Sequence, residues 1–333
     1  MDAAERAPRI AVLVPCHNEA AAIAKVIADF RASLPGAELH VFDNNSSDGT
    51  AQVALAAGAR VRHVQLQGKG NVVRRMFAEV EADIYVLVDG DDTYDAAAAP
   101  MLVDRLCRDD LDMVVGSRAH QDRAAYRSGH RTGNVLLTRC VGLLFGRSFD
   151  DMLSGYRVFS RRYVKSFPAH SSGFEIETEL AVHALQLRMP VAEVATAYGV
   201  RPEGSASKLR TYRDGARILF TIARLFKNER PLAFFSIVTG LCVLASFVLA
   251  WPLLLTYLQT GLVPRFPTAI LCVALVLLGA VLFACGLILD TVTRGRVELK
   301  HLMYLSVSGN GSGTGAHRPD AMTATQGQEA RTP

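Results

Sequence analysis

Short apolar runs alternate with segments of helical periodicity along the first third of the chain. Repeated strand–helix units of this kind form a largely parallel sheet with helices on both faces. We therefore predict an α/β fold whose ligands bind at the carboxyl ends of its strands. Strands are expected at residues 10–14, 39–42, 61–64, 84–88 and 113–115, and helices at 20–33, 48–57, 69–80 and 100–107.

The segment from 117 to 210 has a more mixed pattern. Residues 132–144 and 175–187 have helical periodicity, and residues 191–198 have the pattern of a strand. A helix with one apolar side is expected over 212–227. Such a helix suits the headgroup layer of a membrane, although an ordinary helix packed on the domain surface would have the same pattern.

Two long uncharged stretches, 232–258 and 266–289, follow near the C-terminus. Each exceeds the roughly 20 residues that a helix needs to span a bilayer core. Because the connection over 259–265 is short, the two spans are expected to form a hairpin. The residues beyond 305 are rich in Ser, Gly, Thr and Gln, a composition typical of a disordered tail.

Positive charges indicate the orientation of this hairpin, because Lys and Arg concentrate on the cytoplasmic side of membrane spans. We therefore expect a multi-pass protein of the inner (plasma) membrane with its N-terminal portion in the cytoplasm. The predicted parts are an N-terminal domain over 1–210, an amphipathic juxtamembrane helix over 211–230, a hairpin over 231–305 and a tail over 306–333. The cations are Arg224, Lys227 and Arg230 before the first span, Arg294, Arg296 and Lys300 after the second, and Arg265 alone between them.

Overall composition narrows the class of function. The net charge of +4 is small and no nucleic-acid-binding motif is present, so we expect no nucleic-acid partner. The six cysteines have no paired metal-ligand spacing and are expected to be reduced. The first eight residues are polar and lack the apolar core of a signal peptide.

The acidic stretch Asp89-Gly90-Asp91-Asp92 is the most informative motif of the chain. It follows a predicted buried strand, and carboxylates bunched there repel one another unless a cation or hydrogen-bond donors lie between them. Mg²⁺ or Mn²⁺ suits such oxygen ligands and is commonly completed by substrate phosphates. Asp89 and Asp91 are therefore candidate metal ligands. A solvated acidic turn is the alternative interpretation.

Two further motifs follow predicted strands. The turn from Asp43 to Thr50 carries carboxylates and small polar side chains, and a carboxylate there can accept a nucleobase N–H; Asp48 is also placed to cap the next helix. Gly68-Lys69-Gly70 opens a helix and combines flexibility with a cation, which suits an anion.

Arginines and glutamates complete the candidate chemistry. Arg118 and Arg157 each follow small, flexible residues, and a guanidinium binds phosphate through a fork of donors. Solvated surface cations are the alternative. Glu175 and Glu177 are either active-site carboxylates or partners of a helix dipole. Additional positive charge close to the predicted membrane surface comes from Arg201, Lys208 and Arg210.

The order of these motifs resembles that of the family 2 glycosyltransferases, and within them the polyprenyl-phosphate glycosyltransferases of the dolichyl-phosphate mannose synthase and bactoprenol glucosyltransferase group. The resemblance covers about residues 10–210 and extends through the hairpin. It implies a glycosyltransferase A-type domain. The motifs are Pro15-Cys16-His17-Asn18-Glu19, the turn from Asp43 to Thr50, Gly68-Lys69-Gly70, Asp89-Gly90-Asp91 and Ser154-Gly155-Tyr156-Arg157.

The resemblance also implies a role for each matching residue. Asp89 and Asp91 would hold Mg²⁺ or Mn²⁺ against the sugar-nucleotide diphosphate, and Arg118 and Arg157 would receive the lipid phosphate. Asn44 departs from the family, because many relatives carry a second Asp there, and some relatives have Gln in place of Asp91. The residues implied to hold the nucleoside are Pro15, Asn18, Glu19 and Asp43, with Lys69 beside the nucleotide or diphosphate.

The resemblance implies transfer of a hexose from a nucleotide sugar to polyprenyl (undecaprenyl) phosphate. UDP-glucose is the first choice of donor, and GDP-mannose, UDP-N-acetylhexosamine and uronic acid donors are alternatives. The expected reaction is metal-dependent and inverting. A homo-oligomer, either tetramer or dimer, is expected from relatives with this hairpin. The alternatives are a transferase acting on a lipid-linked oligosaccharide or polysaccharide, and a non-catalytic membrane subunit that binds a nucleotide sugar.

Overall fold

The computed structural model describes residues 7–118, 139, 141–143, 149–169, 171–173, 175–199, 220 and 223–307. Several predictions concern segments outside these residues. The helices expected over 132–144 and 212–227 fall largely outside them, as does the tail after 305. Arg201, Lys208 and Arg210 also lie outside the described residues.

A seven-stranded sheet forms the centre of the N-terminal domain, in the order β3-β2-β1-β4-β6-β5-β7. Among the described strands, β6 alone runs against its neighbours, β4 and β5. The predicted mostly parallel α/β fold is therefore confirmed. The strands are β1 (Ile10–Cys16), β2 (Glu38–Asp43), β3 (Arg60–His63), β4 (Ile84–Leu87), β5 (Met113–Arg118), β6 (Arg157–Ser160) and β7 (Val191–Thr196).

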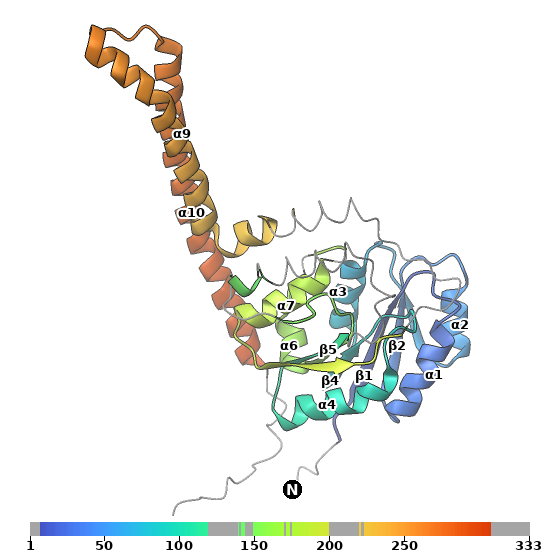
Figure 1. The fold of residues 1–333 in the computed structure, drawn as a ribbon. Helices are drawn as coiled ribbons and strands as arrows, with labels where there is room; N and C mark the ends of the chain where they lie inside the picture. The colour runs from blue at the N-terminus through green and yellow to red at the C-terminus, as the bar shows by residue number, and fades with distance from the viewer. Residues whose placement is uncertain are drawn as a thin grey trace, which may run out of the picture.

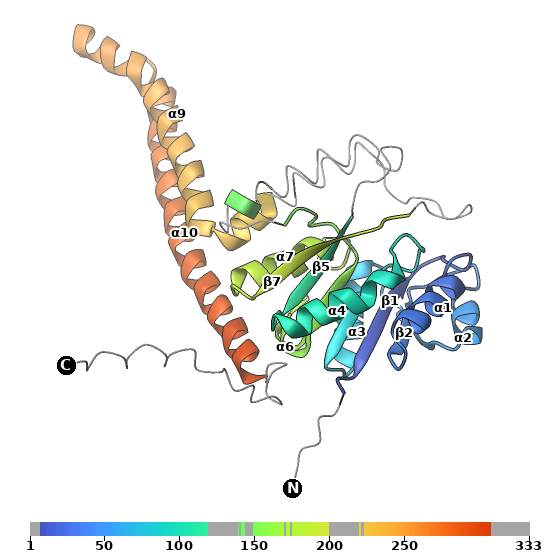
Figure 2. The ribbon, with the colours of Figure 1, turned by 60° about the horizontal axis from the view of Figure 1, so that its bottom comes forward.

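Helices cover both faces of the sheet, because its strands are apolar on both sides. One buried cluster joins the sheet to α3, α6 and α7, and the other joins it to α1 and α4, which lie in front of the strands in Figure 2. Each helix predicted within the described residues is present. Their bounds are α1 (Ile23–Ser33), α2 (Thr50–Ala56), α3 (Lys69–Glu79), α4 (Ala99–Arg108), α6 (Arg161–Ser166) and α7 (Ile176–Gln186), with a short 3₁₀ turn, η1 (Ala96–Ala98).

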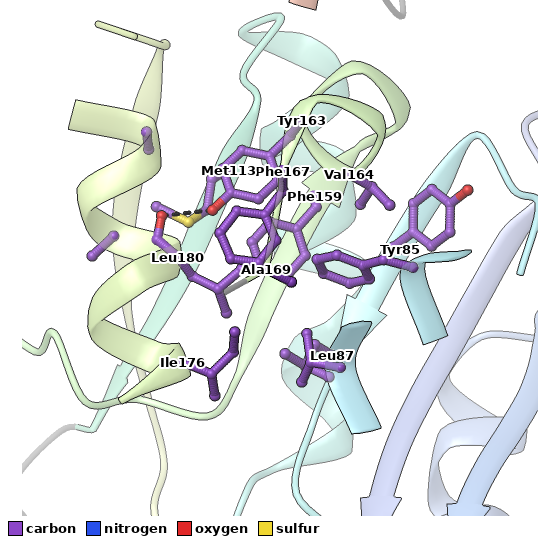
Figure 3. Close-up of a cluster of buried hydrophobic side chains, with 14 of the residues drawn as sticks. Tyr85, Leu87, Met113, Phe159, Tyr163, Val164, Phe167, Ala169, Ile176 and Leu180 are labelled. Atoms are coloured by element: carbon purple, nitrogen blue, oxygen red, sulfur yellow. Dashed lines mark hydrogen bonds between the residues drawn. The ribbon is translucent and has the colours of Figure 1, made fainter. Parts of the chain in front are cut away.

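Aromatic rings fill the core between the sheet and α6 and α7 (Figure 3). The rings of Phe159 and Tyr163 stack with centroids 4.6 Å apart, and Phe77 meets Phe159 edge to face. The Tyr163 hydroxyl donates to the Leu180 carbonyl at 2.6 Å, so its polar atom is satisfied inside the core. This packing joins β6, α6 and α7 into one unit.

Strand β6 was not predicted from the sequence. It has only four residues, which is too short for a periodicity signal, and its first residue, Arg157, was interpreted as a phosphate-binding cation. The strand pairs with β4 on one side and β5 on the other. Val158 and Phe159 point to opposite apolar clusters, so both sides of this strand are buried.

Helices α9 (Pro231–Thr260) and α10 (Phe266–Ser306) form the predicted hairpin, which projects from the domain in Figure 1. Both are long and apolar enough to cross a membrane. Few residues in the most apolar stretch of either helix are buried against the rest of the protein. These helices therefore show two outward apolar surfaces of the kind that lipid covers.

The seam between α9 and α10 repeats every seven residues. The buried positions of α10 are Cys272, Gly279, Gly286 and Thr293. The Ser246 hydroxyl donates to the Cys272 carbonyl at 3.0 Å, and the Thr239 hydroxyl, seven residues earlier, donates to the Gly279 carbonyl at 3.0 Å. Small residues at this spacing let the two helix backbones approach closely.

We predict that Gly286→Val will separate the helices at this seam. A Cβ at Gly286 would lie 2.9 Å from the Phe235 Cβ, and overpacking of this kind costs about 1–3 kcal/mol. Thermal unfolding in detergent should show a clear loss of stability. Gly295→Val is the matched control, since a Cβ there has no atom within 4 Å. Equal unfolding temperatures for the two variants would contradict the proposed seam.

Candidate functional site

The carboxyl ends of β1, β2 and β4 bring the predicted polar motifs together. Cys16 at the end of β1 lies beside Asp43 at the end of β2. On the other side of β1, Gly90 follows β4 so closely that a Cβ there would lie 2.6 Å from the Cys16 sulfur. Successive strands are added on opposite sides of β1, and such a switch point is where open α/β sheets bind ligands.

Lys69 is the central cation of the site. Its Nζ lies 2.6 Å from an Asp89 carboxylate oxygen and 2.7 Å from a Glu177 carboxylate oxygen. The Lys69 side chain is only 9% exposed and that of Glu177 is 12% exposed. The ion pairs therefore join the first turn of α3, the loop after β4 and the first turn of α7 around one buried charge.

The buried cluster carries more negative than positive charge. Burial opposes the charge on Lys69, but Asp89 and Glu177 hold the pKa of Lys69 above its ordinary value. Burial, with a contribution from Asp89, raises the pKa of Glu177 above its ordinary value, while Lys69 acts in the opposite direction. Asp91, which is 3% exposed, adds a further buried carboxyl group nearby in the chain. Such a site favours an additional cation.

Glycines make the close approaches in this cluster possible. A Cβ at Gly155 would collide with the Asp89 carboxylate, so only glycine leaves room for that side chain. Cβ atoms at Gly68 and Gly70 would collide with the carbonyl oxygens of Ser172 and Ser171. The Gly70 N–H also donates to the Ser172 carbonyl at 3.1 Å. The loop before α7 thus lies directly on the start of α3, which places Glu177 beside Lys69.

The three carboxylates in the acidic stretch after β4 have different surroundings. Asp91 accepts a hydrogen bond from the Thr93 hydroxyl at 2.6 Å, which fixes the turn. Asp92 pairs with Lys25 of α1 at 2.8 Å. Asp89 and Asp91 are therefore the two carboxylates of this stretch that are not committed to α1.

Asp89 and Asp91 fit a Mg²⁺ or Mn²⁺ site of the kind that substrate phosphates complete. Mg²⁺ is usually held by one or two protein carboxylates together with phosphates and water. Within the described residues, no group of three or more His, Cys, Asp or Glu side chains converges as a site that could hold a metal ion. The excess negative charge around Lys69 supports the pair of aspartates as ligands.

Asp43 is nearly buried, at 3% exposure, yet one of its oxygens has an unused hydrogen-bonding capacity. Its Oδ2 lies 3.2 Å from His63 Nδ1 and accepts the Ser46 N–H at 3.4 Å. Its Oδ1 has no hydrogen-bond partner in the structure. A buried acceptor without a donor is costly, so this oxygen is suited to a donor supplied by a ligand.

The loop after β1 is joined to the turn after β2. Exposed Asn18 accepts the Ser47 N–H at 2.8 Å and donates its own N–H to the Ser46 hydroxyl at 2.9 Å. The Glu19 N–H donates to the Thr50 hydroxyl at 2.9 Å. Asn18 and Glu19 therefore shape the wall beside Asp43, while Pro15 lies in β1 opposite Phe42.

Asn44 holds the segment that leads into Lys69. Its amide group donates to the carbonyls of Val64 and Leu66, each at 2.9 Å, and its carbonyl accepts the Gly68 N–H at 2.7 Å. A carboxylate could not donate these two hydrogen bonds. The amide group of Asn44 therefore suits the loop over 64–68, whose carbonyls accept both of its hydrogen bonds.

The two predicted phosphate-binding arginines lie on β5 and β6, and each has hydrogen-bond partners of its own. The guanidinium of Arg118, at the end of β5, makes two hydrogen bonds to Asp151, at 2.6 and 2.7 Å, and lies over the Tyr198 ring at 5.5 Å. Burial acts to raise the pKa of Asp151, but hydrogen bonds from Arg118 prevail and lower it.

Arg157 lies inside the domain, with 1% exposure. Its Nη2 donates to the Met152 carbonyl at 2.6 Å and its Nε donates to the Ser154 carbonyl at 3.0 Å. These bonds fix the backbone that carries Gly155 beside Asp89. The guanidinium is buried because Arg157 is the first residue of β6, which pairs with β4 and β5. Its predicted contact with the lipid phosphate stays a prediction.

The sequence left the role of Glu177 open, and the structure places it at the centre of the site. The sequence showed an acidic residue at an otherwise apolar helix start, and this pattern fits a partner of the helix dipole as well as an active-site carboxylate. Glu177 and Lys69 are 108 residues apart, so no local pattern could pair them. Tyr94 is a further site residue that the sequence did not indicate; its hydroxyl accepts the Gly155 N–H at 2.8 Å.

Comparisons with known proteins agree with this arrangement. The family model for glycosyl transferase family 2 matches residues 11–167, from β1 to the end of α6. Protein RfbJ of Shigella flexneri is 61% identical over 123 residues, which cover 37% of this chain and 95% of that protein. A dolichyl-phosphate hexose transferase of Haloferax volcanii is 28% identical over 222 residues, covering 66% and 95% respectively.

A solved structure also shares the fold. Glucosyl-3-phosphoglycerate synthase of Mycobacterium tuberculosis, in complex with Mn²⁺, UDP-glucose and phosphoglyceric acid, matches with a TM-score of 0.53 and 27% identity. The match covers 66% of this chain and 79% of that one.

We predict that Asn44→Asp will destabilise the domain. The variant loses two donated hydrogen bonds and places a carboxylate against two carbonyls, which should cost about 1–3 kcal/mol or more. Chemical unfolding should show this loss. Asn45→Asp makes the same change at an exposed neighbour whose amide donates one hydrogen bond, to Gln65, and should cost less. Equal losses at both positions would show that the contacts of Asn44 are not special.

Proposed function

Because the chain belongs to glycosyl transferase family 2, we propose that it moves a hexose from a nucleotide sugar to polyprenyl (undecaprenyl) phosphate. UDP-glucose is our first choice of donor. The observation that carries the proposal is the Lys69–Asp89–Glu177 cluster, next to Asp91 in the chain, at the switch point of the sheet. The named dolichyl-phosphate hexose transferase and the UDP-glucose complex support the two substrate classes.

The nucleoside would bind against the ends of β1 and β2. The buried Asp43 oxygen would accept an N–H of the base, which supplies the donor it lacks. Pro15, Asn18 and Glu19 would form the adjoining wall. Lys69 would face the diphosphate, with Glu177 and Asp89 fixing the position of its ammonium group.

Asp89 and Asp91 would hold Mg²⁺ or Mn²⁺ beside the diphosphate. A bound divalent ion stabilises the negative charge that develops on a departing diphosphate. Gly155 leaves the space for Asp89, and Thr93 orients Asp91, so both carboxylates are held before the substrate arrives. Such prior positioning lowers the entropic cost of reaching the reactive geometry.

The acceptor needs little general-base assistance, because a phosphate monoester is already anionic at neutral pH. The proposed task of Arg118 and Arg157 is to receive that phosphate, with Arg118 the nearer to the surface. In-line attack would invert the anomeric centre and give a β-linked lipid sugar from an α-linked donor.

The apolar hairpin would anchor the enzyme in the inner membrane, with both ends and the catalytic domain in the cytoplasm. The cations that flank the helices support this orientation. The donor and the lipid phosphate would then meet on the same side of the bilayer. Dimeric or tetrameric assembly remains part of this proposal.

We predict that Asp91→Asn will abolish transfer of radiolabelled glucose from UDP-glucose into organic-extractable lipid. The substitution removes charge but little volume, so the protein should stay folded. Chelation by EDTA should silence the wild type, and Mn²⁺ or Mg²⁺ should restore it. Asp92→Asn is the matched control. Asp92 pairs with Lys25, so this variant should retain most of the transferase activity. Full activity of Asp91→Asn, or of the wild type in excess chelator, would refute the metal site.

The product of the same assay separates the alternatives. Label in a lipid-linked oligosaccharide instead of a monosaccharide lipid would favour the longer acceptor. Absence of transfer with every donor tested, together with retained nucleotide-sugar binding, would favour a non-catalytic subunit.

We also predict that Arg118→Lys will weaken use of the lipid acceptor. Lysine keeps a cation beside Asp151 but cannot reproduce the fork of a guanidinium. Loss of a charge-assisted contact costs roughly 1.5–3 kcal/mol, or about one to two powers of ten in affinity. The KM for polyprenyl phosphate should rise while calorimetric nucleotide binding stays unchanged. Arg108→Lys, on the exposed end of α4, is the control. Collapse of nucleotide binding would assign Arg118 to the donor.

A further inference from the structure

Helix α10 is much longer than a bilayer requires. Its 41 residues extend about 62 Å at 1.5 Å per residue, roughly twice the thickness of a hydrocarbon core. Figures 1 and 2 both show that its last part continues past the hairpin and runs alongside the N-terminal domain. This part of α10 is therefore available to connect the membrane helices to the sheet.

The upper part of this contact joins α10 to the segment before α9. The Thr293 hydroxyl and the Arg296 guanidinium both donate to the Asn228 carbonyl, at 3.3 and 3.4 Å. One turn further on, Lys300 donates to the Gln186 side chain at 2.8 Å. Gln186, at the end of α7, in turn donates to Glu229 at 2.6 Å. Three elements are thus connected by polar contacts.

The lower part of the contact is built on Asp112, which is 0% exposed. The Tyr304 hydroxyl donates to Asp112 Oδ2 at 2.8 Å. Ser160 and Arg162 donate to Asp112 Oδ1 at 2.6 and 2.5 Å, and the Arg162 guanidinium also lies 5.1 Å from the centre of the Tyr304 ring. A membrane-helix residue is therefore hydrogen-bonded to a buried carboxylate of the domain.

Asp112 immediately precedes β5, the strand that ends at Arg118. A six-residue strand spans about 20 Å, and the helix from Thr293 to Tyr304 spans a comparable length, about 16 Å.

Contacts at several levels prevent α10 from sliding along the domain. They also prevent rotation, since a shift of one residue turns a helix by about 100° and would remove Tyr304 from Asp112.

We propose that Tyr304 and Lys300 are positioning residues that hold the catalytic site at a fixed height and tilt above the membrane. This inference rests on the proposed function, because its benefit is to an acceptor whose phosphate lies at the bilayer surface. A soluble acceptor diffuses to the site and gains nothing from a fixed height. A lipid acceptor reaches the site only where the domain is held correctly.

The test is the double variant Lys300→Ala/Tyr304→Ala, assayed with undecaprenyl phosphate in vesicles and with a short, water-soluble prenyl phosphate. We expect loss of about tenfold to a hundredfold with the vesicle acceptor, in the range that misplacement costs, and little change with the soluble acceptor. Leu302→Ala/Leu305→Ala is the matched control, because both side chains lie on the same turns and are 63% exposed. Tyr304→Phe, which loses the hydroxyl and keeps the ring, should lie between wild type and the double variant.

Equal losses with both acceptors, or no loss with either, would overturn the inference. A second readout needs no catalysis. It is the pulsed EPR distance in nanodiscs between a label on Cys107, exposed on α4, and one on Leu262→Cys in the connecting loop, with the other cysteines replaced by alanine. The double variant should broaden this distribution, and an unchanged distribution would refute the docking. Failure of the wild type with both acceptors would instead refute the proposed function, while the distance measurement still decides the docking.

Discussion

The site depends on the ion pairs that the ammonium group of Lys69 makes with two carboxylates. This ammonium group neutralises part of the charge of Asp89 and Glu177, which come from a strand end and a helix start far apart in the sequence. Without this cation, the partly buried Asp89 carboxylate and the more deeply buried Glu177 carboxylate would lose their shared partner, and a buried charge without a partner is strongly destabilising. The same charge balance leaves an excess of negative charge that a divalent ion can satisfy.

Close backbone contact makes that balance possible. The glycines on both sides of Lys69 have no Cβ, so the carbonyls of Ser171 and Ser172 can pack directly against them. The Asp89 carboxylate packs against Gly155 in the same way. A glycine-rich helix start suggests flexibility for phosphate binding when only the sequence is known. In the structure these glycines also allow the loop before α7 to pack closely on α3, and this packing places Glu177 beside Lys69. The chemistry and the fold therefore require the same small residues.

Periodicity and length were sufficient to predict the parallel sheet, its covering helices and the apolar hairpin. They also placed Asp43, Lys69, Asp89 and Asp91 at one edge, because parallel strands end at the same side. Strand β6 and the burial of Arg157 were not predictable in this way. Four residues carry too little pattern, and the decision between surface and core depends on the neighbouring strands. The pairing of Lys69 with Glu177 is a long-range contact, and the fit of Asn44 to the carbonyls of Val64 and Leu66 depends on loop geometry.

The Asp112 contact has a consequence for the order in which the protein is made. The described sheet elements precede the hairpin along the chain, so the ribosome completes them before Tyr304 is synthesised. Asp112 already has Ser160 and Arg162 as partners from within the domain. Its carboxylate therefore does not wait unpaired for the last helix. The nascent domain can fold with its buried charge neutralised, and α10 docks afterwards on a surface that is already formed.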